Sequence, residues 1–270
     1  MLRPRLIPCL LIQNGGLVKT QTFKMPKYVG DPINAVKIFN EKQADELIVL
    51  DIDATVNGSE PNYELIAKLA AECRMPLCYG GGITTASQAA RIVDMGVEKV
   101  AVSHAGIVNN HLLTQIANEV GRQSLVAVLD VRKKSSLLSN GYEVCSRNGT
   151  APHKVDPILL AQQLQDAGAG ELVINSIDRD GLMQGYDLEL ALQFKQALKV
   201  PVTFLGGAGS LEHMEELISK LGLVGAAAGS LFIFKGKYRA VLINYPTPAK
   251  KQQICQESFA KCIINGVKII

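Results

Sequence analysis

A glycine-rich turn occurs twice in this chain, 126 residues apart, at residues 80–83 and 206–209. Each copy directly follows a short apolar run, and the preceding segments 47–53 and 172–178 resemble each other as well. A fixed internal period restricts the possible architecture before any single residue is considered. The sequence therefore predicts two related halves of about 120 residues, each built from strand and helix units and each carrying an equivalent anion-binding turn.

Short aliphatic runs without polar alternation are typical of strands that are buried on both faces of a parallel sheet. Such runs begin at Arg5, Glu46, Met75, Glu98, Ser124, Glu171, Val200 and Leu223. Helical patterns lie between them at 32–42, 62–73, 86–95, 110–120, 156–167, 187–198 and 211–221. This alternation predicts an α/β fold, either a (β/α)8 TIM barrel or a doubly wound sheet. The twofold half-barrel repeat favours the closed barrel.

Two segments interrupt the alternation. Residues 131–155 form a long polar connection, within which 141–145 have the pattern of one arm of a hairpin. After residue 234 the chain is basic, then strand-like over 240–245, then helical over 248–264. The composition does not shift enough to separate a second domain. We therefore expect one barrel over residues 1–270 with a C-terminal extension from about residue 235.

The composition narrows the class of protein. A net charge of +3, 20% charged residues, 5% aromatic residues and no Trp give no signature of nucleic-acid or membrane binding. No signal peptide or long apolar segment is evident, so a cytoplasmic location is expected. The six cysteines show no C-x-x-C pair, which predicts buried thiols and neither a metal site nor disulfides. We expect no cofactor.

In a barrel of this kind the active site lies where the strands end, on the loops that lead into the helices. Asp130 ends the fifth strand after four apolar residues, which makes it a candidate general acid or base. Ser103 with His104, and Gly229 with Ser230, end strands four and eight beside the two glycine turns. Backbone N–H groups and a hydroxyl at a helix start bind phosphate well, so one ligand with a phosphate at each end is expected to span the site.

Four charged residues stand at the opposite, N-terminal ends of strands one, two, four and six: Arg5, Glu46, Lys99 and Glu171. They are either ordinary surface charges or, if they point inward, a ring of two cations and two anions at the barrel floor. Charges inside a barrel must be paired, because an unpaired buried charge is very costly.

These features together resemble the cyclase subunit of imidazole glycerol phosphate synthase, the HisF-type barrel of histidine biosynthesis. The resemblance covers about residues 1–235 except the 131–155 loop, and rests on residues 5–10, 18–19, 51–52, 80–83, 130, 176–181 and 206–209. It implies that ammonia from a HisH-like glutaminase enters at the floor and crosses the core to a phosphorylated substrate at the top.

The resemblance also assigns roles to individual residues. The four floor charges match the family's ammonia gate, and Glu98 and Gln123 would lie in the contact with the glutaminase. One phosphate site maps to Gly82, Ser103 and His104, and the other to Asp180, Gly181, Gly207, Gly229 and Ser230.

The chain departs from the family at the catalytic top. Leu11 stands where the family has one of its two catalytic aspartates, which leaves Asp130 as the remaining one. Residues 13–16 also lose the charges of the family's turn, and Ser103-His104 replaces Asn-Thr. Removal of a positioned acid or base costs a factor of about 10² to 10⁴ in rate.

Several functions are compatible with this pattern. The chain resembles a divergent paralog branch that works with a glutaminase and a sugar-modifying amidotransferase to amidinate a surface-polysaccharide nucleotide sugar. The segment 234–245 and Leu11 favour that branch. The alternative is a working cyclase, a lyase of histidine biosynthesis, in which Asp130 suffices with Asp178 or His104. A sister phosphoribosyl isomerase would not need an ammonia gate. A barrel that only conducts ammonia and acts as an allosteric effector is also compatible.

Overall fold

The computed structural model describes residues 3–134 and 141–264. Its centre is a closed barrel of parallel strands in the order β10-β11-β12-β1-β4-β5-β6-β7, and a β7–β10 pairing closes the ring. The TIM-barrel prediction is therefore confirmed. The strands are β1 (Arg5–Gln13), β4 (Leu47–Asp51), β5 (Leu77–Gly80), β6 (Lys99–Val102), β7 (Leu125–Lys133), β10 (Glu171–Ser176), β11 (Val202–Leu205) and β12 (Gly225–Ala228).

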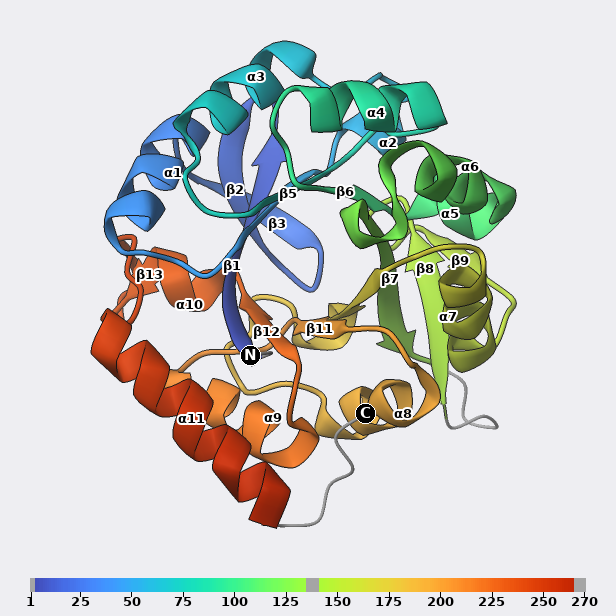
Figure 1. The fold of residues 1–270 in the computed structure, drawn as a ribbon. Coiled ribbons are helices and arrows are strands. Elements are labelled where there is room, and N and C mark those ends of the chain that lie inside the picture. The colour runs from blue at the N-terminus through green and yellow to red at the C-terminus, as the bar shows by residue number, and fades with distance from the viewer. Residues whose placement is uncertain (1–2, 135–140, 265–270) are drawn as a thin grey trace.

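Helices form the outer ring around the strands, as the end-on view shows (Figure 1). The principal ones are α1 (Pro32–Glu41), α3 (Tyr63–Glu72), α4 (Ala86–Asp94), α6 (His111–Val120), α7 (Pro157–Asp166), α8 (Leu188–Ala197) and α9 (Leu211–Leu221). Each lies within one or two residues of its predicted range. Local capping explains these starts: the side chains of Asp31, Asn62 and Asp187 accept hydrogen bonds from backbone N–H groups of the first turns of α1, α3 and α8.

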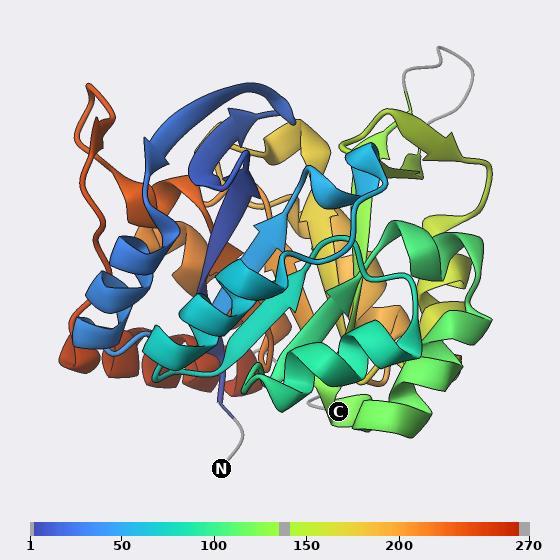
Figure 2. The same ribbon diagram turned by 90° about the horizontal axis from the view of Figure 1, so that it is seen from above.

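The twofold repeat extends beyond the barrel strands. The first strand of each half, β1 or β7, continues into an antiparallel pair: β2 (Gly16–Gln21) with β3 (Lys24–Gly30), and β8 (Tyr142–Ser146) with β9 (Ala151–His153). The hairpin arm expected at 141–145 is confirmed, whereas the β2–β3 pair was not predicted. Figure 2 shows both pairs at one end of the barrel and the N-terminus at the other. We call these ends the top and the floor.

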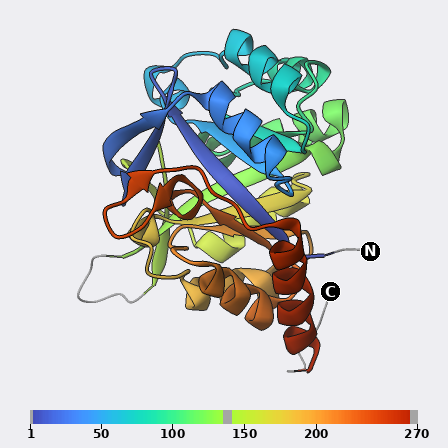
Figure 3. The ribbon, with the colours of Figure 1, turned by 90° about the vertical axis from the view of Figure 1, so that its left-hand side faces the viewer.

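The C-terminal extension packs beside the floor. A two-residue pairing of β13 (Phe234–Lys235) with β14 (Ala240–Val241) leads to α11 (Pro248–Ile264), which lies along α9 (Figure 3). The helix was predicted. The strand expected over 240–245 was wrong beyond Val241, because Tyr245 turns inward and donates its hydroxyl hydrogen to the carbonyl of Leu6. This contact fixes the extension to β1.

Among the described residues, no helix is both long and apolar enough to cross a membrane.

Apolar side chains form two separate clusters. The larger one fills the space between the strands and the helices. The smaller one lies inside the barrel and contains Ile7, Cys9, Ile48, Cys78, Ala101, Val126, Val128, Val173, Leu205 and Ala227, with Leu11 and Leu50 packed against it. The barrel interior is therefore an apolar core between a polar top and a charged floor, and it positions both candidate sites.

Candidate active site and charged floor

A pocket of about 240 Å³ opens at the top of the barrel, where the strands end. Residues from every barrel strand or the loop that follows it line this pocket. All the residues expected at the catalytic and phosphate positions are among them: Gly82, Ser103, His104, Asp130, Asp180, Gly181, Gly207, Gly229 and Ser230. The pocket therefore gathers residues that are up to 221 positions apart in the chain, between Cys9 and Ser230.

Asp130 is a titratable group of this pocket whose pKa differs strongly from its ordinary value. Burial raises the pKa of its carboxyl to about 7, although a hydrogen bond from the Asn175 side-chain amide, 2.9 Å long, opposes that rise. The carbonyl oxygen of the same amide, Asn175 Oδ1, is buried without a partner in the structure. A carboxyl that titrates near neutrality can both accept and donate a proton, as general acid–base catalysis requires.

The replacement Asp130→Asn should raise the free energy of unfolding at pH 8. A carboxyl whose pKa is about 7 when folded and about 3.9 when unfolded binds protons more tightly in the fold. Stability therefore falls as pH rises from about 4 to about 7, and asparagine escapes this loss. We expect a gain of about 1–3 kcal/mol at pH 8 and almost none at pH 4, measured by urea denaturation. An equal gain at both pH values would contradict the raised pKa.

The barrel's internal symmetry places Leu11 opposite Asp130. In the second half, Asp130 of β7 pairs in register with Asn175 of β10. In the first half, Leu11 of β1 pairs in the same way with Leu50 of β4. One half of the pocket thus presents a polar pair and the other half an apolar pair. Leu11 has no group that can transfer a proton, so this position of β1 offers no counterpart to the Asp130 carboxyl.

The β2–β3 hairpin is fixed over the pocket mouth by Asp180. The Asp180 carboxylate accepts hydrogen bonds from the Thr20 hydroxyl, at 2.6 Å, and from the backbone N–H of Phe23, at 3.3 Å. A β-carbon on Gly181 would lie 2.0 Å from the Thr20 carbonyl oxygen, so only glycine allows this approach. Asp180 was expected to bind phosphate, and this stays a prediction; its Oδ2 accepts both hydrogen bonds from the hairpin. Its role in the structure is to hold the hairpin in place.

The β8–β9 hairpin leans over the opposite side of the mouth. Its turn residue Asn148 donates to the Ile52 carbonyl at 2.9 Å, and Arg147 donates to the Val56 carbonyl at 3.2 Å. Both residues also line the pocket. Two symmetry-related hairpins therefore narrow the entrance from opposite sides, and neither set of contacts is visible in the sequence pattern.

Lys19 is a pocket residue to which the sequence reasoning gave no role. Its ammonium group is buried in β2 and donates to the Cys9 carbonyl at 2.6 Å. Burial lowers its pKa. A β-carbon on Gly229 would lie 2.5 Å from Lys19 Nζ, which places this cation beside the second glycine turn. In the sequence, Lys19 could have been recognised as a lysine that directly follows the apolar residues Leu17 and Val18.

The two glycine turns have the backbone geometry that an anion site needs. Gly82 and Gly207 have φ values of +73° and +106°, which L-residues with side chains rarely adopt. A β-carbon would clash with backbone at 2.7 Å at Gly82 and at 2.1 Å at Gly207. The short helices α5 (His104–Val108) and α10 (Ser230–Ile233) start beside these turns. Phosphate binding at these two turns stays a prediction.

His104 is held by a chain of hydrogen bonds. Its Nδ1 lies 2.9 Å from the Ser146 hydroxyl, and that hydroxyl lies 2.8 Å from Nε2 of His153. Ser146 is fully buried. Burial lowers the pKa of His104, and the charges of Arg147 and His153 lower it further. The contact was not predicted, because Ser146 and His153 belong to the hairpin that follows the other half's first strand.

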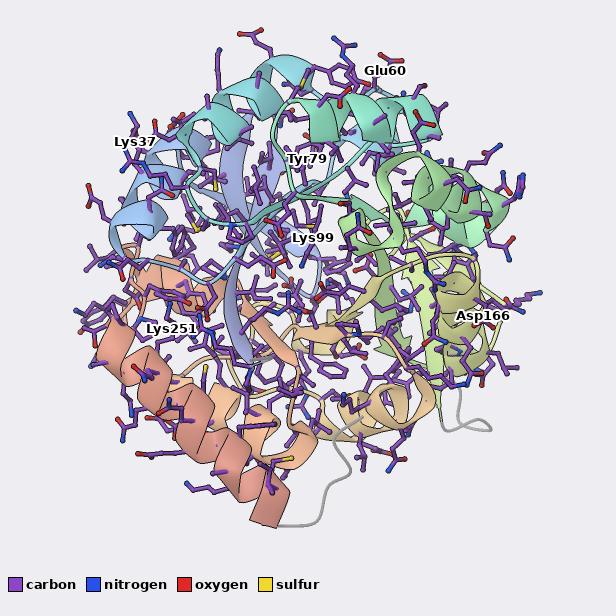
Figure 4. All side chains as sticks on the ribbon, in the orientation of Figure 1. Lys37, Glu60, Tyr79, Lys99, Asp166 and Lys251 are labelled. Carbon is purple, nitrogen blue, oxygen red and sulfur yellow. The ribbon has the colours of Figure 1, made fainter. Side chains whose placement is uncertain are left out.

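The four charges at the floor form a closed ring. Glu46 and Glu171 each bond to both Arg5 and Lys99: Lys99 Nζ lies 2.9 Å from a carboxylate oxygen of each, and Arg5 Nη2 lies 2.6 Å from Glu171. The Thr203 hydroxyl donates to Glu171 at 2.6 Å. Seen from the floor, Lys99 lies near the barrel centre (Figure 4). The structure thus brings the four predicted floor residues together around the axis.

Glu98 and Gln123 are exposed; Glu98 directly precedes β6, and Gln123 lies in the short turn Arg122–Ser124 before β7. They therefore lie at the floor rim, where a partner could contact them. Asp178, considered as a second catalytic carboxylate, is not among the pocket-lining residues. Its carboxylate accepts a hydrogen bond from the Lys133 backbone N–H at 2.7 Å instead. It holds β7 in place and does not face the candidate ligand.

Comparison with known proteins agrees with this architecture. The family model described as "Histidine biosynthesis protein" matches residues 5–239. A Vibrio vulnificus protein, provisionally named imidazole glycerol phosphate synthase subunit hisF3, is 56% identical over 94% of this chain and 96% of its own length. The chain belongs to the HisF-type family of histidine biosynthesis proteins.

Differences in sequence identity between relatives place this HisF-type barrel within the family. A Pseudomonas aeruginosa protein, provisionally named subunit hisF2, is 52% identical over 91% of this chain and 97% of its own length. Subunit HisF of Sulfurisphaera tokodaii is 35% identical over 85% of this chain and 90% of its own length. The higher identity lies with the numbered hisF paralogs, so this HisF-type barrel groups with that branch.

Proposed function

We propose that this HisF-type barrel receives ammonia at its floor from a HisH-like glutaminase and delivers it through the barrel core to the top pocket. The observation that carries the proposal is the closed ring of Arg5, Glu46, Lys99 and Glu171 on the barrel axis. Two carboxylates and two cations that satisfy one another block bulk water, and their ion pairs can open without rearrangement of the barrel strands.

The barrel interior supports passage of a neutral molecule. Between floor and pocket it is lined by apolar side chains and by Cys9 and Cys78. Burial raises the pKa of Cys9 to about 11, and the pKa of Cys78 also lies well above its usual value. Both thiols are therefore uncharged at neutral pH. An apolar lining disfavours ammonium by the desolvation cost of a charge, whereas neutral ammonia escapes that cost.

The pocket supports a ligand with two phosphate groups. Gly82 and Gly207 supply two backbone turns on opposite halves of the barrel, and Lys19 adds a cation beside the second turn. The apolar pair Leu11–Leu50 replaces one acid–base position. We therefore infer that the physiological role is that of the paralog branch, in which ammonia is passed on to a sugar-modifying amidotransferase that amidinates a surface-polysaccharide nucleotide sugar.

A working imidazole glycerol phosphate synthase cyclase is the second candidate. It is favoured by Asp130, whose pKa of about 7 suits acid–base catalysis, and by the name of the Sulfurisphaera tokodaii relative, imidazole glycerol phosphate synthase subunit HisF. A lyase of histidine biosynthesis would need Asp130, with His104 as the other titratable candidate in the pocket, to serve the proton-transfer steps.

Lys99→Ala should uncouple glutamine hydrolysis from ammonia use. Lys99 bonds to both Glu46 and Glu171, so its removal opens the ring and lets nascent ammonia leak to solvent. In a complex with a HisH-like glutaminase, glutamine-driven product formation should fall about tenfold, while added ammonium salt should still support it. Lys68→Ala, which removes an exposed ion pair on α3, is the matched control. Unchanged coupling in Lys99→Ala would refute the conduit.

Glu98→Lys should weaken the complex with the glutaminase without affecting the fold. Glu98 is exposed at the floor rim, and rim charges mainly set association rate and specificity. We expect a change of about tenfold in the dissociation constant measured by titration calorimetry. Gln123→Ala should have a smaller effect, since no charge changes. If a glutaminase binds equally well to native barrel and Glu98→Lys, the docking face lies elsewhere.

A further inference from the structure

We propose that His104, Ser146 and His153 form a proton-uptake unit, through which binding of a doubly charged anion at the Gly82 turn places a proton on His104. The inference deepens the proposed phosphate site and rests on it. It makes the first anion turn chemically different from the second one at Gly207, and it identifies His104 as the residue that recognises the charge state of the ligand.

The hydrogen-bond geometry requires a defined arrangement of protons. The Ser146 hydroxyl contacts His104 Nδ1 at 2.9 Å and His153 Nε2 at 2.8 Å, and it carries one hydrogen. When the hydroxyl donates to one ring, the other ring must donate its N–H to the hydroxyl oxygen. Ser146 is fully buried, so bulk water does not compete for either contact. The tautomers of the two rings are therefore linked.

This linkage allows a proton to move without rotation of a ring. A doubly protonated His153 passes its Nε2 proton to the Ser146 oxygen, and Ser146 passes its own proton to His104 Nδ1. His153 becomes neutral, His104 becomes a cation, and the serine is regenerated. The two histidines lie on opposite sides of the buried hydroxyl, and His104 lines the pocket together with Gly82 and Ser103. His153 is half-buried on β9, where it can exchange protons with solvent.

The surrounding charges favour a neutral His104 when no ligand is bound. Arg147, on the β8–β9 turn, and His153 both oppose a positive charge on it, in addition to burial. Two cationic histidines around one hydroxyl would repel each other, so the pair takes up one proton rather than two. The other titratable groups that line the same pocket are Lys19, Asp51, Asp130 and Asp180.

A dianion at the Gly82 turn reverses this balance, because it lies on the same pocket wall as His104 and favours the imidazolium. Binding and protonation are then thermodynamically linked, and the anion binds more tightly as pH falls through the range in which His104 titrates. If anion binding raises the pKa of His104 by one unit, this corresponds to a tenfold gain in the affinity for the anion.

Sulfate is a suitable probe, since it stays doubly charged throughout this pH range and neither releases nor takes up protons. Titration calorimetry of the full chain in two buffers of different ionisation enthalpy gives the protons taken up per sulfate bound. At about pH 6.5 we expect uptake of roughly 0.5–1 proton, and binding about tenfold tighter at pH 5.5 than at pH 8. His104→Gln should abolish the uptake. His111→Gln, a change at an exposed histidine on α6, is the matched control.

Nitrogen-15 NMR of histidine-labelled protein tests the relay itself. In the native chain, sulfate should shift the titrations of His104 and His153 together. In Ser146→Ala, whose change removes both hydrogen bonds, the two rings should titrate independently. The proposal is overturned if sulfate does not bind, if uptake persists in His104→Gln, or if the rings are already independent in the native chain. None of these outcomes bears on ammonia coupling, which the Lys99→Ala experiment measures separately.

Discussion

Arg5→Ala should lower the free energy of unfolding by about 3 kcal/mol, the largest stability effect that we expect from a single change in this chain. Arg5 bonds to both carboxylates of the ring, and these are only 4% and 8% exposed at Glu46 and Glu171. Its loss leaves two buried negative charges with Lys99 as their remaining cation. Urea denaturation at pH 7, with the transition followed by circular dichroism, measures the change.

Lys220→Ala is the matched control for this prediction. Lys220 forms an ion pair with Glu216 at 2.8 Å, and the two side chains are 54% and 48% exposed. Exposed pairs contribute about 0–1 kcal/mol, since water and salt screen them and ordering the side chains costs entropy. Equal losses for Lys220→Ala and Arg5→Ala would mean that the floor ring is no more buried than a surface pair. The ring could not then close the barrel.

Ammonia-dependent cyclase turnover on the histidine-pathway substrate should be about 10² to 10⁴ times slower than that of a HisF enzyme with both carboxylates. Leu11 lies at the pocket wall, and its register partner is Leu50, so no second proton-transfer group stands opposite Asp130 on β1 or β4 at these positions. A steady-state assay with excess ammonium salt measures this directly. Turnover of about 1 s⁻¹ or faster would overturn the paralog assignment in favour of the working cyclase.

Leu11→Asp sharpens the same test. If the remainder of the pocket is intact, a carboxylate at this position should raise turnover by at least about tenfold. Leu11→Asn is the matched control, because asparagine has nearly the same shape as aspartate and is also polar, but it cannot ionise. A gain in both variants would indicate a packing effect. No gain in either would mean that the pocket has diverged beyond position 11, as Ser103 and His104 at the first anion turn already indicate.

The asymmetry between the two half-barrels is the structural basis of these proposals. The floor keeps four charges in a fully paired ring, whereas the top keeps its glycine turns but has one polar pair and one apolar pair. A barrel that conducts ammonia needs the first feature. A complete acid–base site on both sides needs a carboxyl at Leu11 as well as at Asp130. This asymmetry therefore favours the proposed ammonia-conducting role over cyclisation.

Local sequence was sufficient to predict the strands and helices, and the internal repeat favoured the closed barrel over a doubly wound sheet. Uninterrupted aliphatic runs are stable only as strands covered on both faces, and capping residues such as Asp31 and Asn62 set the helix starts from within one turn. The glycine turns were also recognisable, because positive φ at Gly82 and Gly207 excludes almost every other residue. These features depend on neighbours in the chain, so a periodic pattern reveals them.

Only the tertiary structure decided how side chains from distant segments combine. Arg5 and Glu171 are 166 residues apart, and their pairing depends on barrel closure between β7 and β10. The contact of His104 with Ser146 depends on a hairpin that folds back over the pocket, and the hydrogen bond from Thr20 to Asp180 joins residues 160 positions apart. A residue's type states which bonds it is able to make, whereas the fold selects the partner, because burial removes the alternative of bonding to water.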